Sequence, residues 1–266
     1  MESASLTEKI VKLFLTLLGI GILNAGYTFA EDGFRIDKEL VRASELYKQR
    51  ENRENLTLAV EIYENISKHI PQGESSNNND RAEALVALSR CCFKLASYHT
   101  KSNKEKAVWY EKGEGYGRKA VQTDPSNVGG YYWMAQNIGE HGSISKLYFL
   151  NRKSEFEDAL KKAELLDNPQ EPYDYAGIYR TLTAYHTPRF LWGNLEKALE
   201  YAKKMEDSPR YLCNLSVLAD LYWKTDKKKA EGYAKQIVNA DISRYPETQF
   251  ENSIEQKEIA GKRGLQ

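Results

Sequence analysis

The chain has 266 residues, and its 38 Lys and Arg residues balance its 38 Asp and Glu residues, so the formal net charge is zero. A balanced charge gives no electrostatic footprint for nucleic acid or for an anionic membrane surface. The hydrophobic fraction of 41% is sufficient for a folded core and excludes a disordered chain. Three cysteines are too few for a disulfide scaffold or a cysteine-based structural zinc site.

The N-terminus has the pattern of a secretory signal. Lys9 and Lys12 precede an apolar run over residues 13–23, and small residues follow up to Ala30. The run is shorter than the roughly 20 residues that a membrane-spanning helix needs. We therefore expect residues 1–30 to be a cleaved signal peptide and residues 31–266 to be one periplasmic or otherwise exported domain. An uncleaved membrane anchor is the alternative, and no lipoprotein Cys follows the run.

The three cysteines fit small buried positions on helices. Cys91 and Cys92 are adjacent, and adjacent cysteines rarely bridge each other because the geometry is strained. A disulfide from either of them to Cys213 remains open in an exported protein.

Nearly every segment after Asp37 has apolar residues at 3.6-residue spacing, and no run of alternating β-branched residues predicts a strand. The second helix of a tetratricopeptide repeat carries a small residue, further small or apolar residues four and seven later, and Pro near twelve. Five segments follow this frame in full or in part: Ala59-Tyr63-Ile66-Pro71, Gly113-Ala120-Pro125, Ala159-Ala163-Leu166-Pro169, Ala198-Ala202-Met205-Pro209 and Ala230-Ala234-Ile237-Pro246.

A partner helix precedes each of these segments. The partner helices are expected over residues 37–50, 81–99, 128–141, 173–187 and 211–224. The polar segment 71–80 is expected to be a loop, and residues 124–127 should end one helix and cap the next. A polar helix over residues 247–262 would close the stack. The sequence therefore predicts an all-α, tetratricopeptide-like solenoid of about five helical hairpins with a C-terminal capping helix.

Three blocks are more specific than the repeat frame: Tyr-Tyr-Trp-Met-Ala-Gln-Asn-Ile-Gly at 131–139, Ala-Gly-Ile-Tyr-Arg-Thr-Leu at 176–182, and Pro-Arg-Phe-Leu-Trp-Gly-Asn-Leu-Glu-Lys-Ala at 188–198. In this order they resemble the TatT family, the tetratricopeptide-repeat T component of TRAP transporters, over about residues 105–260. A weaker likeness, carried by Asp-Pro-Ser-Asn at 124–127 and the aromatic block, is to the regulators of microtubule dynamics.

The TatT resemblance implies a periplasmic accessory protein of a TRAP-type uptake system. Such a protein would dock a solute-binding protein, could hold a small, partly apolar organic anion, and could form a homo-oligomer with a pore through each subunit. The alternative is a general scaffold that binds a peptide or partner protein in its concave groove. An enzyme is the third hypothesis and the least favoured, because no nucleophile–base set can be identified.

The aromatic block supplies the first candidate binding residues. Tyr131, Tyr132 and Trp133 project over about 200° of one helix, so at least one should reach a pore or a concave surface. The alternative is that Trp133 is a core residue covered by a tyrosine. Asn137 lies on the same helix face as Trp133 and would either orient a ligand or bond a loop backbone.

The second set of candidates surrounds an aromatic-rich loop. Tyr185, Arg189, Phe190 and Trp192 would line a binding face or, alternatively, plug the groove of their own repeat. Arg180 and Arg189 are the candidate anion-binding residues, because guanidinium groups bind carboxylates bidentately. The alternative for Arg180 is a structural hydrogen bond to loop carbonyls.

No cofactor or metal is expected. The four histidines are scattered and form no metal-binding pair: His69, His99, His141 and His186. The glycine-rich stretch over residues 113–117 follows a helical segment rather than a strand, so it does not indicate a dinucleotide site.

Overall fold

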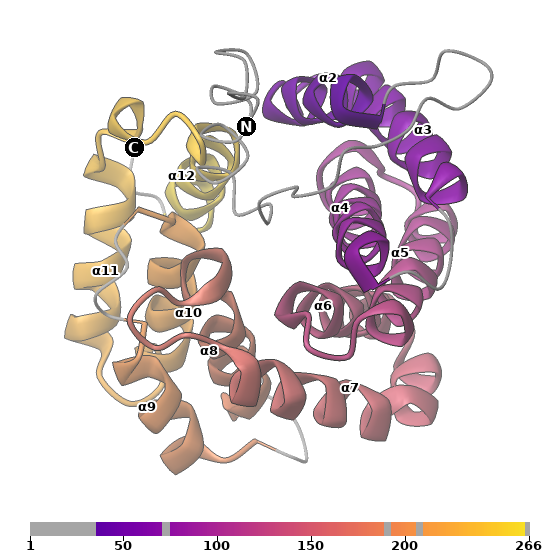
Figure 1. Cartoon of the computed structure of the whole chain (residues 1–266). Helices are drawn as coiled ribbons and strands as arrows, with labels where there is room; N and C mark the ends of the chain where they lie inside the picture. The colour runs from indigo at the N-terminus through magenta and orange to yellow at the C-terminus, as the bar shows by residue number, and fades with distance from the viewer. Residues whose placement is uncertain (1–35, 71–74, 189–192, 206–209, 264–266) are drawn as a thin grey trace. The chain divides into compact units, whose positions relative to one another are not determined.

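The computed structural model describes residues 36–70, 75–188, 193–205 and 210–263. Throughout these ranges the regular structure is helical and includes no strand (Figure 1), so the predicted all-α, tetratricopeptide-like fold is confirmed. The chain divides into two compact units at residue 166. We call Met1–Leu166 unit 1 and Asp167–Gln266 unit 2.

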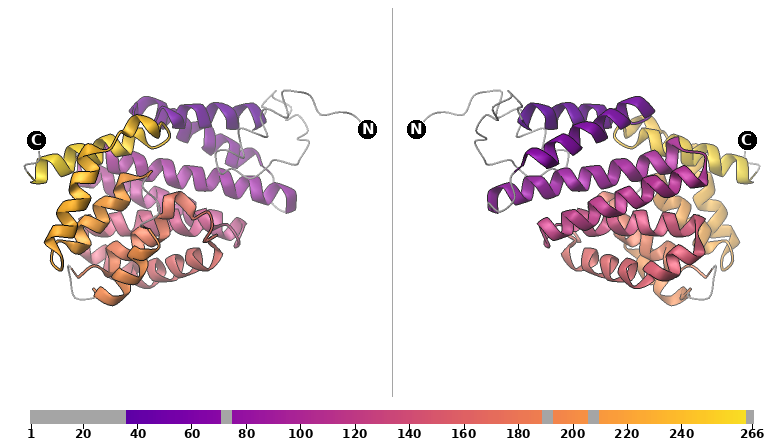
Figure 2. Two further views of the ribbon diagram at one scale, coloured as in Figure 1. Left: turned by 90° about the vertical axis from the view of Figure 1, so that its left-hand side faces the viewer. Right: turned by 90° about the vertical axis from the view of Figure 1, so that its right-hand side faces the viewer.

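Unit 1 is a stack of three helical hairpins. Its described helices are α2 (Ile36–Lys48), α3 (Arg53–His69), α4 (Ser75–His99), α5 (Asn103–Thr123), α6 (Val128–Ile144) and α7 (Lys146–Leu166). Each helix packs against the next, and α4 also packs against α6, so the first helices of the second and third hairpins are neighbours. The right-hand view of Figure 2 shows the helices of unit 1 following one another in chain order.

Unit 2 contains the remaining two hairpins and the closing helix. Its described elements are α8 (Tyr173–His186), α9 (Leu195–Lys203), α10 (Leu212–Tyr222), α11 (Lys227–Asn239), the short 3₁₀ helix η1 (Ile242–Arg244) and α12 (Gln249–Arg263). The α12 helix packs on α10 and α11, where Ile259 joins a core that includes Leu218 and Ile237. Asn252 of α12 also accepts a hydrogen bond from the Leu212 amide at 2.9 Å, which caps α10 from another helix.

The small residues of the repeat frame allow the helices to approach closely. Five alanines that begin or continue the frame are fully buried: Ala59, Ala120, Ala163, Ala198 and Ala230. The frame places Leu166 at an apolar packing position, but this residue is 39% exposed. It is the last residue of α7 and lies beyond the packed turns.

Polar side chains set where the helices begin. Asn127 accepts a hydrogen bond from the Gly130 amide at 3.1 Å, which confirms the cap predicted for residues 124–127. The prediction of a loop over residues 71–80 was wrong in part, because α4 already begins at Ser75. Ser and Asn cost only about 0.5 kcal/mol each in a helix, so extending an existing helix through them is inexpensive.

The N-terminal predictions fall outside the part of the chain that the structure describes. The expected signal peptide, residues 1–30, therefore stays a prediction. Among the described helices, none combines the length and apolar character needed to cross a membrane. Cys91, Cys92 and Cys213 are free thiols, the first two buried in α4.

Candidate functional site

The first helices of the three hairpins in unit 1 bring cationic and aromatic side chains together. These residues are contributed by α2 and the turn after it, by α4 and by α6. We call this set the cationic aromatic face, and it consists of Tyr47, Arg50, Arg90, Phe93, Lys94, Tyr98 and Trp133. On α4, residues 90, 94 and 98 share one side because they are four apart, and residue 93 lies on the same side, three after residue 90.

Each cation of this face contacts at least one ring. The guanidinium carbons of Arg50 and Arg90 lie 5.1 and 4.1 Å from the centroid of the Tyr47 ring. The Lys94 ammonium lies 5.3 Å from the ring centroid of Tyr98 and 5.8 Å from that of Trp133. Both distances are within the range in which a ring face attracts a cation. The face therefore places each of its three cations against an aromatic ring.

The face has buried and half-exposed members. Arg50 and Lys94 are 7% and 4% exposed, and Trp133 is 2% exposed. Tyr47, Arg90, Phe93 and Tyr98 are half-buried. A hydrogen bond between His99 Nε2 and the Arg50 carbonyl, at 2.7 Å, fixes the turn after α2 against the end of α4. This bond sets the position from which Arg50 reaches the Tyr47 ring.

The pKa of the Cys91 thiol depends on its burial and on these three cations. Burial raises the pKa of its thiol to about 12, although Arg90, Arg50 and Lys94 each pull it in the opposite direction. Desolvation nevertheless dominates, so Cys91 is a protonated thiol at neutral pH and no nucleophile.

The predicted aromatic block lies on α6, partly within this face. Tyr132 and Trp133 are buried and pack edge to face at 4.9 Å, while Tyr131 is half-exposed. Asn137 is fully buried and donates from Nδ2 to the Trp133 carbonyl at 2.8 Å and to the Ser89 carbonyl at 3.2 Å. Asn137 thus holds α6 against α4, whereas the Trp133 ring lies beside the Lys94 ammonium.

The other predicted site residues belong to unit 2, and some of them lie outside the residues that the structure describes. Tyr185 is half-buried beside the His186 ring, with centroids 5.0 Å apart. Arg189, Phe190 and Trp192 lie outside the described residues. The structure therefore does not bring the two predicted candidate sets together within one unit.

Arg180 supports an unusual start of α8. Asp174, Tyr175 and Ala176 have φ angles of 49°, 56° and 62°, a left-handed turn that costs non-glycine residues roughly 1–2 kcal/mol each. Arg180 donates to the Asp174 carboxylate at 2.9 Å and to Asn214 Oδ1 at 2.9 Å. Asn214 Nδ2 in turn donates to the Tyr175 carbonyl at 2.8 Å. These bonds offset part of the strain within unit 2.

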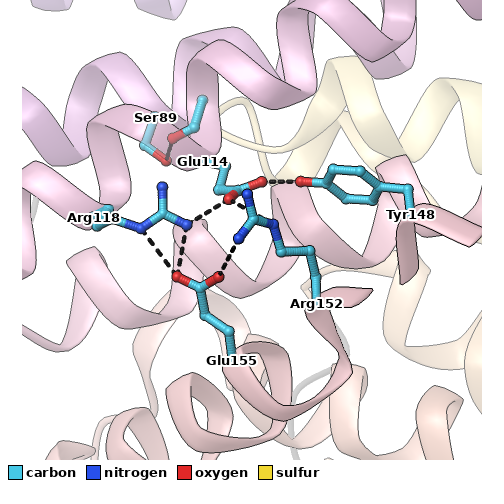
Figure 3. A network of polar contacts seen from close by, with 7 residues as sticks. Ser89, Glu114, Arg118, Tyr148, Arg152 and Glu155 are labelled. Atoms are coloured by element: carbon cyan, nitrogen blue, oxygen red, sulfur yellow. Dashed lines mark hydrogen bonds and ion pairs between the residues drawn. The ribbon is translucent and has the colours of Figure 1, made fainter. Parts of the chain in front are cut away.

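A separate polar network joins α5 to α7 (Figure 3). Glu114, whose side chain is 4% exposed, accepts a hydrogen bond from the Tyr148 hydroxyl and pairs with Arg118 at 2.5 Å. Arg118 also pairs with Glu155 at 2.6 Å, and Arg152 lies between the two carboxylates. These charged side chains pair with one another across α5 and α7. We therefore assign to this network the role of holding the third hairpin on the second.

His141 of α6 stacks on Tyr148 at the edge of that network, with ring centroids 3.6 Å apart. Burial holds the pKa of its imidazole below 6.5, although Glu111 and Glu114 pull it upward. As the pH falls below 6.5, His141 therefore takes up a proton more readily in the unfolded chain than in the folded one. The free energy of unfolding falls as a result. We expect His141→Phe to make this fall shallower, as measured by denaturant unfolding between about pH 7 and 5. A proton NMR titration placing His141 at or above its ordinary pKa would contradict this.

Sequence reasoning missed Tyr47, Arg50, Arg90 and Lys94. The only local signal is that Arg90 and Lys94 recur four residues apart on a helix whose neighbouring positions are apolar. Among the described residues no group of His, Cys, Asp or Glu is placed to hold a metal ion.

The fold and these contacts define a tetratricopeptide-like helical protein whose first unit carries a cationic aromatic face. The family model of regulator of microtubule dynamics protein 1-3 matches residues 40–173, half of the chain, and the chain belongs to that family. The match runs from α2 to the first residue of α8, which is nearly the whole described part of unit 1. A search of curated proteins finds no matching relative.

This membership corrects three predictions. The resemblance to the TatT family was wrong, and the weaker likeness was the correct one. The inferred role in a TRAP-type uptake system was therefore wrong, together with its periplasmic solute-binding partner. The blocks that suggested TatT include Tyr132, Trp133, Ala176 and Ile178, all buried, and core residues of helical repeats recur in unrelated families.

Proposed function

We propose that the chain is a non-enzymatic regulator of microtubules and that it acts by binding a protein of the microtubule through unit 1. The observation that carries the proposal is the family match, whose name is that of regulators of microtubule dynamics and whose span coincides with α2–α7. Stacked helical hairpins present one continuous surface to a partner, which suits binding rather than catalysis. A generic peptide-binding scaffold is the coarser form of the same proposal.

The test is co-sedimentation of the full chain with stabilised microtubules. We expect the chain to pellet with polymer and to remain in the supernatant without it, with half-saturation in the micromolar range on the order of transient interfaces. The same preparation should change the growth or shortening rate of dynamic microtubules observed by fluorescence microscopy. A folded chain that neither pellets nor alters these rates would contradict the proposal.

A further inference from the structure

A cluster of lysines surrounds an exposed tryptophan where α10 passes into α11 in unit 2. The cluster consists of Trp223, Lys224, Lys227 and Lys228, all exposed, and we call it the lysine–tryptophan tip. Trp223 is 45% exposed, more than either of the other two tryptophans within the described ranges. The Lys227 ammonium lies 5.5 Å from the centroid of the Trp223 ring, so the tip presents charge and ring together.

Hydrogen bonds fix the backbone that carries these side chains. The Asp226 and Thr225 amides donate to the Tyr222 carbonyl at 2.8 and 3.1 Å, which closes the turn between the two helices. The Asp226 carboxylate then caps α11 by accepting a hydrogen bond from the Lys229 amide at 2.9 Å. A ligand therefore meets side chains whose backbone is already ordered, which lowers the entropy cost of binding.

The lysines of the tip have no acidic partner in the part of the chain that the structure describes. The side chains of Lys224 and Lys228 form no ion pair or hydrogen bond there, and that of Lys227 contacts only the Trp223 ring. Lys227 and Lys228 are also the first two residues of α11, where the helix dipole disfavours cations. The fold gains no stability from these charges, which leaves them available to a partner.

Charge complementarity favours an acidic protein segment over a broad anionic surface such as a membrane. Unit 2 contains equal numbers of acidic and basic residues, so it has no net charge that would attract such a surface to the unit as a whole. A flat anionic surface at the tip would also approach the exposed Asp226 carboxylate, whereas a narrow segment can place its own carboxylates beside the lysines alone. An aromatic or apolar residue of that segment would cover the Trp223 ring, and tryptophans are frequent among the residues that dominate binding.

We propose that the lysine–tryptophan tip of unit 2 docks an acidic segment of a partner protein, in which Glu or Asp residues flank an aromatic or apolar residue. The lysine ammonium groups pair with the carboxylates, while the apolar residue packs on the Trp223 ring. This site goes beyond the proposed function, because it lies in unit 2 and outside residues 40–173, which carry the family match.

The experiment uses the full chain and a fluorescent peptide of repeated Glu-Glu-Phe units, with a Gln-Gln-Phe peptide as its neutral control. Fluorescence anisotropy should show binding of the acidic peptide alone, with affinity falling as salt rises from about 0.05 to about 0.2 M. The double variant Lys227→Gln, Lys228→Gln should weaken this binding by about tenfold, and Trp223→Ala by about threefold or more. Lys161→Gln with Lys162→Gln, which removes an adjacent pair of exposed lysines from α7, should leave the affinity unchanged.

Three outcomes would overturn the proposal. The first is equal affinity for the acidic and neutral peptides, and the second is an equal loss of affinity in the two double variants. The third is binding to phosphatidylcholine vesicles that contain phosphatidylserine, without binding to the acidic peptide, which would assign the tip to a membrane surface. The peptide comparison uses the unmodified chain, so it decides the question even if a variant unfolds.

Discussion

Gly117→Ala should destabilise unit 1 by about 2–3 kcal/mol, although alanine normally stabilises a helix by about 1 kcal/mol relative to glycine. A Cβ atom on residue 117 would lie 2.7 Å from Met134 Cβ and 2.8 Å from Met134 Cα. The second of these atoms belongs to the backbone of α6, so no rotamer change relieves the clash. The two helices would have to separate, and the interface of the second and third hairpins would lose its close packing.

Gly113→Ala should have a similar cost for a related reason. Its Cβ would lie 2.3 Å from Asn137 Oδ1, and Asn137 is held by hydrogen bonds to the Trp133 and Ser89 carbonyls. Ser89 itself donates to the Gly113 carbonyl at 2.7 Å, so displacement of Asn137 disturbs a buried set of bonds between α4, α5 and α6. Breaking these bonds leaves buried polar groups without partners, at about 1–3 kcal/mol.

Gly115→Ala is the matched control on the same helix. No atom lies within 4 Å of the position its Cβ would take, so the ordinary gain of helix propensity should raise stability slightly. Thermal unfolding of the three variants by circular dichroism, with hydrogen exchange of α5 and α6 amides, assigns the effects to unit 1. Equal melting temperatures in all three variants would show that the spacing of α5 and α6 does not depend on these glycines.

The glycines illustrate what local sequence can and cannot predict. The spacing of Gly113 and Ala120 predicts the second helix of a hairpin, because small residues at helical intervals permit close approach. Hairpin boundaries follow in the same way from residues such as Asn127, whose cap is formed within a few residues of the chain. These features depend on local interactions, and the sequence was sufficient for them.

The candidate site depends on distant residues, and the sequence was not sufficient for it. Arg50 and Arg90 are 40 positions apart in the chain, and only the stacking of α2 on α3 and of α3 on α4 places both at the Tyr47 ring. The same holds for Arg180, whose left-handed turn is supported by Asn214 from another helix. Aromatic residues such as Trp133 could be recognised as important, yet their burial does not reveal which charges they meet.

Glu114→Gln should lower the free energy of unfolding of unit 1 by about 2–3 kcal/mol. The substitution keeps the shape of the side chain and removes a negative charge that is almost fully buried. Arg118 and Arg152 would then share the single carboxylate of Glu155, leaving an excess positive charge between α5 and α7. Because both arginines are more than a third exposed, water compensates part of the loss, and the expected cost is below that of a fully buried pair.

Glu157→Gln provides the control for removing one carboxylate from α7. Glu157 pairs with Lys153 at 2.7 Å on the exposed side of that helix, and such pairs contribute less than about 1 kcal/mol. Urea unfolding of both variants at low and high salt distinguishes the two environments, since salt screens the exposed pair far more than the buried one. If Glu114→Gln cost no more than Glu157→Gln, the network in Figure 3 would contribute little to holding the third hairpin, and packing of α6 on α5 would have to do so alone.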